Sequence, residues 1–278
     1  MIKFGDAVLK DGNKWLTDQL PPDPYNPLNL PPNTVRVRTS DGEPPIIREG
    51  NQAAYETATL VEGTSDVYDV YKSGRSFAYL LDSSTNVIEV LGANTTGITD
   101  MHYMFYRCAI TSLPLFDTSR VTSMECMVGS CTSLTTVPLF DTSMVTHMNT
   151  MFRGCTSLTT VPLFDTSSVK YMDHMFQRCS SLTTVPLFDT SSVTTMHYMF
   201  EDCSSLTYIP LFNTSNVKLY IQRMFYRCYN VESGALALYQ QVSAQDTSML
   251  NHSATFYNCG VNTVTGAAEL AQIPSGWK

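Results

Sequence analysis

Hydrophobic and polar positions along the middle of the chain follow a pattern that repeats every 24 residues. The hexapeptide PLFDTS, or PLFNTS in the last copy, begins at Pro114, Pro138, Pro162, Pro186 and Pro210. In most copies a Met-x-x-Met-Phe-x-x-Cys motif follows, as at Met148 to Cys155. Self-similarity at such a period is typical of a stack in which each repeat packs only against its neighbours.

The spacing inside one repeat predicts its local structure. The segment from Met148 to Cys155 has apolar residues at i, i+3, i+4 and i+7, which predicts one face of a short helix. The segment from Leu134 to Phe140 predicts a short strand, whose pairing begins at or after Pro138 because proline has no amide to donate. The sequence Asp141-Thr142-Ser143 predicts a sharp turn. One repeat therefore predicts strand, turn, short helix and turn.

Such a repeat cannot bury its apolar face alone, so stacking at a strand spacing of about 4.8 Å would supply the core. We expect an α/β repeat solenoid, a leucine-rich-repeat-like stack of about six coils with caps at both ends. A strand is expected at Asn33–Thr39, a strand and then a helix within Val67–Leu81, and a helix at Ala235–Gln245. The expected parts are an N-terminal attachment segment 1–20, a Pro-rich linker 21–32, an N-terminal cap 33–85, the repeats 86–230 and a C-terminal cap 231–278.

Residues that recur at the solenoid period on an apolar face are expected to pack in the core of the stack. The predicted structural ladders of this kind are Phe140, Phe164 and Phe188, and Cys155, Cys179 and Cys203. Catalysis, metal binding and disulfides are alternatives for the cysteines, but parallel side chains have the wrong dihedral angle for a disulfide and no C-x-x-C pair is present. We expect free, buried cysteines that act as small apolar fillers.

A ladder of aspartates, Asp141, Asp165 and Asp189, recurs in the turns. One interpretation is a row of bound Ca²⁺ ions. Calcium takes six to eight oxygen ligands, and each coil offers one carboxylate. The alternative is that each aspartate accepts hydrogen bonds from its own turn. We favour the second interpretation and expect no metal site.

Composition and charge exclude several classes of function. Only 15% of residues are charged and the net charge is −8, which argues against a nucleic-acid partner. No segment approaches the roughly 20 apolar residues of a membrane span, so no membrane insertion is expected. The common catalytic motifs are missing from the sequence, and we expect neither enzymatic activity nor a cofactor. A polysaccharide hydrolase stays a less favoured alternative, because folding can bring carboxylates together.

The block FDTSxVTxMxxMFxxCxSL, here Phe140 to Leu158 and its copies, resembles the BspA-type leucine-rich repeats of bacterial surface proteins. The resemblance covers roughly residues 86–230 and implies a short-repeat solenoid used for adhesion on cell or virus exteriors. It does not imply an enzyme. The flanks, PPNTVRVRTSDG and FYNCG through AELAQIPSGWK, are similar to those of repeat proteins encoded by phages and prophages of gut bacteria.

The N-terminal sequence MIKFGDAVLKDGNKWLTDQL lacks the apolar region of a secretory signal peptide. Exported adhesins need such a signal, whereas a phage virion protein assembles in the cytoplasm. We therefore expect a component of the phage particle surface, attached to other virion proteins through residues 1–20. A bacterial cell-surface or extracellular adhesin is the alternative, and the sequence leaves homo-oligomerisation open.

The positions that change between repeats are expected to face outward and to bind a host-surface glycan or protein. Tyrosine, arginine and histidine at such positions suit recognition. An ordinary solvated face is the alternative interpretation. The candidate binding residues are Tyr103, Tyr171, His174, Arg178, His197 and Tyr198.

Overall fold

The computed structural model describes residues 3–4, 7–10, 14–15, 26–47, 56–217, 219–245, 248 and 250–278. Within residues 1–20 it gives the backbone of three short strands, β1 (Lys3–Phe4), β2 (Ala7–Lys10) and β3 (Lys14–Trp15), which pair antiparallel in the order β1-β2-β3. The rest of the predicted attachment segment, and residues 21–25 of the predicted linker, lie outside the described residues.

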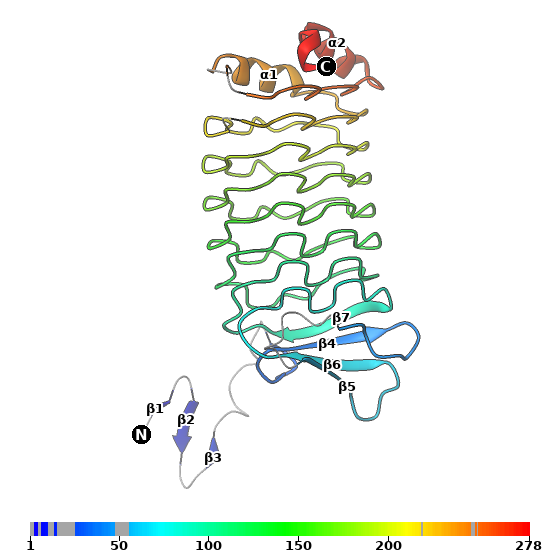
Figure 1. Ribbon diagram of the computed structural model, residues 1–278, viewed down its shortest axis with the longest axis vertical. Helices are drawn as coiled ribbons and strands as arrows, with labels where there is room; N and C mark the ends of the chain where they lie inside the picture. The colour runs from blue at the N-terminus through cyan, green and yellow to red at the C-terminus, as the bar shows by residue number, and fades with distance from the viewer. Residues whose placement is uncertain are drawn as a thin grey trace.

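A four-stranded antiparallel sheet lies at the N-terminal end of the repeats (Figure 1). Its strands are β4 (Thr34–Thr39), β5 (Glu56–Leu60), β6 (Val67–Lys72) and β7 (Val87–Asn94), in the order β5-β6-β4-β7. The strand predicted at 33–39 is confirmed as β4, whose Val35 and Val37 are fully buried. The strand β7 falls inside the first predicted repeat, so that repeat also contributes to the cap sheet.

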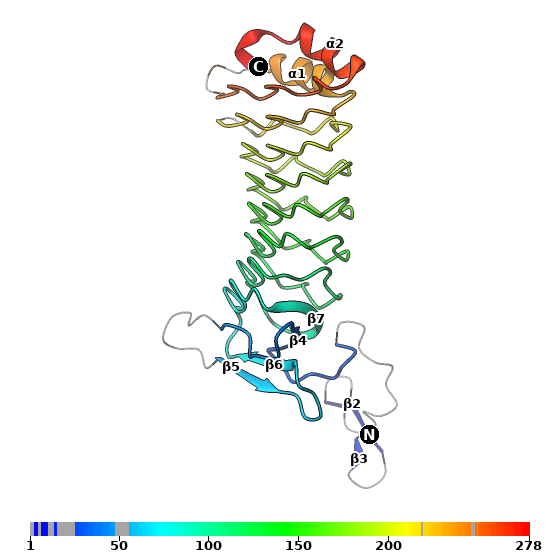
Figure 2. The same cartoon turned by 90° about the vertical axis from the view of Figure 1, so that its right-hand side faces the viewer.

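The repeats lie one above another in a stack of coils (Figures 1 and 2). Parallel bridges join equivalent residues of successive coils, from Ser76–Asp100 through His147–Tyr171 to Tyr171–Thr195. Backbone amides at every second position donate to the next coil: Thr150 N lies 2.9 Å from the carbonyl oxygen of Asp173. The parallel bridges between coils run from Ser76 to Asn251, so the stack extends beyond the predicted limits 86–230 at both ends.

The short helices predicted in the repeats are absent from residues 86–217 and 219–230. In the segment from Met148 to Cys155 the chain makes successive tight turns, closed by Met151 N to Met148 O and Cys155 N to Phe152 O. Thr150 and Gly154 have φ angles of 57° and 75° in the left-handed region. These turns place i, i+3, i+4 and i+7 on the same side, as a helix would. The prediction was wrong because half of the amides bond the next coil instead of the preceding turn.

The predicted repeat strands and one N-terminal helix also need correction. Outside β7 the repeats form isolated bridges rather than strand ladders, and the segment from Leu134 to Phe140 contributes the bond from Thr135 N to Thr111 O to the stack. The helix expected after β6 is instead a coil of the stack: Phe77 N bonds Asp100 O, and Tyr79 has a φ of 60°.

The interior of the stack is a set of apolar columns. The rings of Phe152, Phe176, Phe200, Phe225 and Phe256 stack in turn at centroid distances of 5.2–5.9 Å, and Trp277 closes the column over Phe256 at 6.4 Å. The predicted ladder Phe140, Phe164 and Phe188 is buried beside it, each ring 2% exposed. Phe164 packs on Phe152 and Phe188 on Phe176. The leucine of each PLF triplet points outward instead, and Leu163 is 60% exposed.

Polar side chains tie the coils together inside the stack. The buried threonine of each DTS triplet donates from Oγ1 to a backbone carbonyl of the next coil, as from Thr166 to Asp189 at 2.8 Å. The thiols of the cysteine ladder donate in the opposite direction, to a carbonyl of the preceding coil, as from Cys179 Sγ to Phe152 O at 3.1 Å. All eight cysteines are free and buried. Burial raises the pKa of Cys155 to about 12, so this thiol stays protonated at neutral pH.

The aspartates of the predicted ladder accept hydrogen bonds within their own turns. Asp141 Oδ1 accepts hydrogen bonds from the amide of Ser143 at 3.1 Å and from its hydroxyl at 2.7 Å. The equivalent bonds from Ser167 hold the pKa of Asp165 below its usual value. Each carboxylate therefore acts as a turn acceptor.

The C-terminal cap is helical (Figure 1). It contains α1 (Ala235–Ser243), α2 (Val264–Gln272) and the 3-10 helix η2 (Ser275–Trp277). The helix predicted at 235–245 is thereby confirmed, and it buries Leu238 and Val242. Among the described residues no helix has both the length and the apolar character needed to cross a bilayer.

Candidate binding face

One side of the stack carries most of the residues that differ between repeats, and we call it the variable face. It is built from the segments that contain the Met-x-x-Met-Phe-x-x-Cys motif. In each segment the methionines, phenylalanine and cysteine are buried, whereas most of the residues between them reach the surface. The second residue after the first methionine has a left-handed backbone, with φ of 56° at Tyr103, 57° at His174 and 58° at Tyr198. This conformation costs about 1 kcal/mol or more for a residue other than glycine, and bonds to the next coil fix it.

Equivalent side chains of successive coils lie at stacking distance on this face. The rings of Tyr79 and Tyr103 are 5.0 Å apart and inclined by 15°, and those of His174 and Tyr198 are 4.7 Å apart and inclined by 4°. The reason is that the spacing of hydrogen-bonded chains, about 4.8 Å, is close to the separation at which rings pack. Two aromatic residues at one position of adjacent repeats therefore form a flat, ordered surface.

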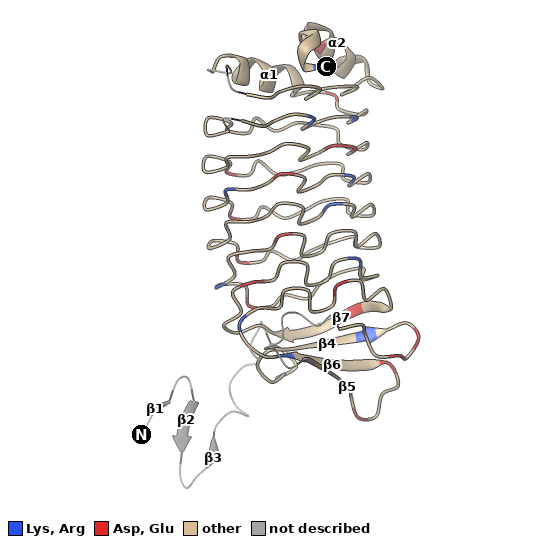
Figure 3. Ribbon diagram, viewed as in Figure 1, with Lys and Arg blue, Asp and Glu red and all other residues tan. Residues whose placement is uncertain are grey.

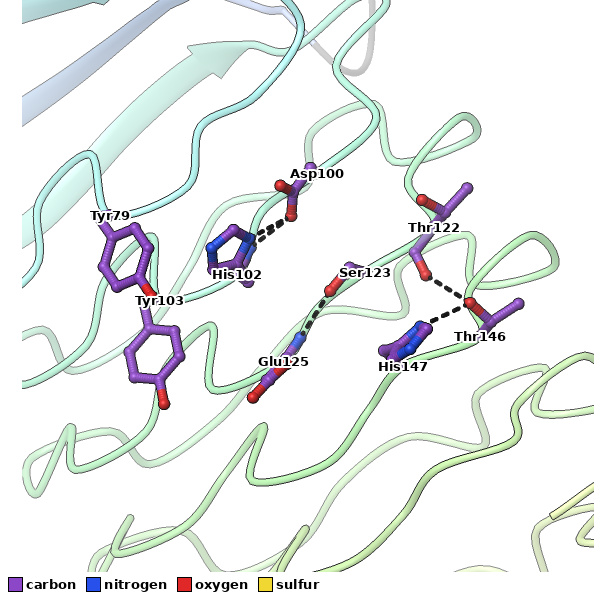
Figure 4. A pocket seen from close by; sticks show the side chains of 9 residues that line it. All are labelled: Tyr79, Asp100, His102, Tyr103, Thr122, Ser123, Glu125, Thr146 and His147. Carbon is purple, nitrogen blue, oxygen red and sulfur yellow. Dashed lines mark hydrogen bonds and ion pairs between the residues drawn. The ribbon is translucent and has the colours of Figure 1, made fainter. Parts of the chain in front are cut away.

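The first stacked pair borders an open depression of about 530 Å³, which we call the aromatic hollow (Figure 4). Figure 4 shows its side chains contributed side by side from successive coils. The lining residues are Tyr79, Asp100, His102, Tyr103, Thr122, Ser123, Glu125, Thr146 and His147. The hollow thus combines two tyrosine rings, two imidazoles, two carboxylates and three hydroxyls.

Hydrogen bonds fix several of these side chains. His102 Nδ1 lies 2.7 Å from Asp100 Oδ1, and the His102 ring meets Tyr79 edge-on at 4.8 Å. His147 Nδ1 lies 2.8 Å from the hydroxyl of Thr146. Burial raises the pKa of Tyr103 to about 12, so its hydroxyl remains neutral at physiological pH. The site offers fixed donors and acceptors beside apolar ring faces.

A second group on the variable face consists of Asp173, His174 and His197, which we call the histidine cluster. Each residue offers a carboxylate oxygen or ring nitrogen that lies within 4.8 Å of those of the other two. Burial lowers the pKa of His197, and the nearby Asp173 opposes this shift. The sequence predicted His174 and His197 as binding residues but did not indicate that they form one cluster with Asp173. The fold adds His197 from the next coil.

Four of the six predicted binding residues belong to these two places or contact them. Tyr103 lines the aromatic hollow, His174 and His197 belong to the histidine cluster, and Tyr198 stacks on His174. Tyr171 lies between the two sites with its ring 4.8 Å from that of His147. Arg178 is exposed and lines neither.

Of the residues that line the hollow, the sequence predicted only Tyr103 as a binding residue and missed the others, Tyr79 and Asp100 among them. Tyr79 lies in a degenerate coil, because Phe77, Leu80 and Leu81 stand where later repeats have methionine and phenylalanine. Aligning Phe77 to Leu81 with Met101 to Phe105 would have placed Tyr79 beside Tyr103. The signal was the apolar spacing together with a tyrosine at the same position.

Charges of both signs are dispersed over the coils (Figure 3). Near the histidine cluster they form a chain of contacts along the stack. Arg153 Nε donates to Gln177 Oε1 at 2.7 Å, and Gln177 Nε2 donates to the buried carboxylate of Glu201. Glu201 also faces Arg223 at 3.5 Å. This chain of contacts orients the polar side chains beside His174.

Comparison with known proteins places the repeats in a family. The family described as "Mycoplasma protein of unknown function, DUF285" matches residues 75–184 and 158–263, which together cover the stack. The chain is similar to the crystal structure of a leucine-rich repeat protein from Eubacterium ventriosum, with 23% identity and a TM-score of 0.38. That match covers 50% of this chain and 39% of the other chain, so it spans about two fifths of that protein. No curated protein matches the chain.

Proposed function

Since the chain belongs to the family described as "Mycoplasma protein of unknown function, DUF285", whose repeats agree with the expected BspA-type pattern, we propose that it is a non-enzymatic adhesion protein. Its repeat solenoid displays the variable face and binds a glycan or protein of a host surface. The interior columns keep the coils in register, and the residues between them supply the contacts.

The aromatic hollow is the observation that carries this proposal. Sugar rings have apolar C–H faces and polar edges, so they fit stacked tyrosines flanked by carboxylates and hydroxyls. Tyr79 and Tyr103 provide the ring faces, and Asp100 and Glu125 provide acceptors. Because the side chains are held by the coils and by hydrogen bonds, little conformational freedom is lost on binding. A glycan is therefore the first candidate ligand, and a host protein is the second.

We place the protein on the surface of a phage particle, as a fibre or decoration component anchored by its N-terminal segment. The similarity of both flanking segments to those of phage-encoded repeat proteins supports this placement. A bacterial cell-surface adhesin with the same repeats is the alternative. Mass spectrometry of purified particles tests the choice: we expect the protein in the particle, and its absence there would leave the cell-surface alternative.

A glycan array read with matched variants tests the binding site. The variant Tyr103→Thr introduces the residue that the repeat already has at Thr150, where φ is 57°, so the fold should be kept. Tyr208→Thr is the control, because Tyr208 is 50% exposed away from the hollow and Thr184 holds its place one coil earlier. Removal of a stacked ring should weaken binding by about tenfold, or roughly 1.4 kcal/mol.

The control should retain the wild-type glycan profile. Equal profiles for wild type and Tyr103→Thr would remove the hollow as the binding site. If no glycan binds, the same variants are applied to binding of host-cell surface proteins, and an equal result there would remove the proposal altogether.

A polysaccharide hydrolase is a weaker alternative that the same hollow makes testable, because glycoside hydrolysis uses a pair of carboxyl groups. Asp100 and Glu125 line the hollow together. However, Asp100 accepts from Ser76 and contacts His102, which suits a fixed binding group. Release of oligosaccharides from host polysaccharide by wild type and not by Glu125→Gln would establish the enzyme. We expect no release from either.

A further inference from the structure

The histidine cluster brings two imidazoles and one carboxylate together across adjacent coils. The backbone bond from His174 N to His197 O, 3.0 Å long, fixes the two coils at this point. All three side chains are half-buried. In the part of the chain that the structure describes, no other group of three histidine, cysteine, aspartate or glutamate side chains converges in this way.

The two rings have the separation that a shared metal ion requires. The centroids of His174 and His197 are 5.1 Å apart and the rings are inclined by 80°. Two imidazoles bound through one nitrogen each to a tetrahedral ion, at about 2.0–2.1 Å, place their centroids about 5.2 Å apart. The three ligand atoms lie within 4.8 Å of one another, so small rotations of the side chains bring them to bonding geometry.

The Nδ1 atom of each imidazole has a hydrogen-bond partner, which leaves Nε2 of each ring for a metal. His174 Nδ1 lies 3.0 Å from Gln177 Oε1, an oxygen that also accepts from Arg153, so His174 donates from Nδ1. His197 Nδ1 lies 2.7 Å from the hydroxyl of Thr195. Outer partners of this kind fix the ring orientation in metal sites and direct Nε2 to the ion.

We propose that Asp173, His174 and His197 bind a divalent transition-metal ion, with zinc as the preferred ion. Two imidazoles and one carboxylate match the ligand types and number of open zinc sites, whereas calcium takes oxygen ligands. Three protein ligands leave at least one coordination position for water or for a donor atom of a bound partner. The metal site goes beyond the adhesion function and does not depend on it.

The repeats themselves supply variants that remove the ligands and keep the coil. In the preceding coil Asn149 and Thr150 occupy the positions of Asp173 and His174, and Asn149 also matches His197. The test variants are therefore His174→Thr, His197→Asn and Asp173→Asn. Asp189→Asn is the control, because it removes an exposed carboxylate from a turn and Asn213 holds the same place in the next coil.

Isothermal titration of the chelator-treated full-length chain with zinc chloride measures binding. We expect one zinc ion per chain, a loss of affinity of about tenfold or more in each histidine variant, and a smaller loss in Asp173→Asn. The control should bind as the wild type does. Titration with cobalt gives a second measurement, because a site with two imidazoles should produce visible absorption bands that disappear in His197→Asn.

Two results would overturn the proposal. One is a folded wild-type chain that takes up no zinc at millimolar concentration. The other is zinc binding of equal affinity in the wild type and in both histidine variants, which would place the ion elsewhere. Circular dichroism of each variant before titration verifies that the fold is intact.

Discussion

Phe176 and His174 are two residues apart in the chain, and they belong to opposite sides of the coil wall. Phe176 is fully buried between Phe152 and Phe200. His174 reaches the variable face and stacks on Tyr198. Both sides use the same coil spacing. Inside, it produces a continuous column of equal residues; outside, it places unlike residues at contact distance, and these contacts make the sites.

The inward and outward sides of the coil tolerate amino-acid substitutions differently. An inward residue must match the coil below and the coil above, because a smaller side chain leaves a cavity that the stack cannot close. An outward residue has to accept only the left-handed backbone. Thr150, His174 and Tyr198 show that this position admits very different side chains. The stack can therefore keep its fold while its recognition surface changes.

The largest expected effect comes from breaking the inward column. Phe176→Ala removes a fully buried ring and should lower the free energy of unfolding by about 3–5 kcal/mol. Phe176→Val, which copies Val128 of an earlier coil, should cost less. The outward variant His174→Thr should change stability by less than about 0.5 kcal/mol. Urea denaturation followed by circular dichroism measures all three, and equal midpoints for Phe176→Ala and His174→Thr would contradict the comparison.

An intermediate effect is expected from the buried threonines, which are polar members of the inward side. Thr166→Val keeps the shape but leaves the carbonyl of Asp189 without the bond it receives from Oγ1. The cost should be about 1–3 kcal/mol. Thr160→Val, at an exposed position of the same repeat, is the control and should be nearly neutral. The same denaturation measurement decides, and a neutral Thr166→Val would show that this bond does not stabilise the stack.

The smallest effect should come from the exposed turns and should depend on pH. Serine hydroxyls and amides lower the pKa of Asp165 and Asp189 in the folded state, so their stabilisation is present above the unfolded pKa and is lost as pH falls through the folded pKa. The double variant Asp165→Asn, Asp189→Asn should therefore show a smaller loss of thermal stability between pH 5 and pH 2 than the wild type. The difference should be no more than about 2 °C.

Thermal melts at a series of pH values measure this difference. Asn213 keeps the same turn bond to the amide of Ser215, at 3.0 Å, so the variant should fold normally. A steeper acid loss in the double variant than in the wild type would contradict the assignment of the aspartates as turn acceptors.

The sequence predicted which side chains face outward but not which of them lie together. Tyr103, His174, His197 and Tyr198 were predicted to face outward because they vary between fixed apolar positions, and the structure places them on the variable face. Their pairing was not predicted. The proximity of His197 to Asp173 depends on the register between coils, and Tyr79 was hidden in a degenerate repeat.

The period of the sequence by itself determined which residues form the interior columns and which positions vary. Apolar residues that recur at a fixed interval can be buried only if the repeats are stacked. The backbone between them was decided by the tertiary structure. A short apolar pattern fits a helix and a series of tight turns equally well. Only the next coil, which accepts the amides of Thr150 and Phe152 at 2.9 Å each, makes the turns the stable choice and brings distant side chains into one site.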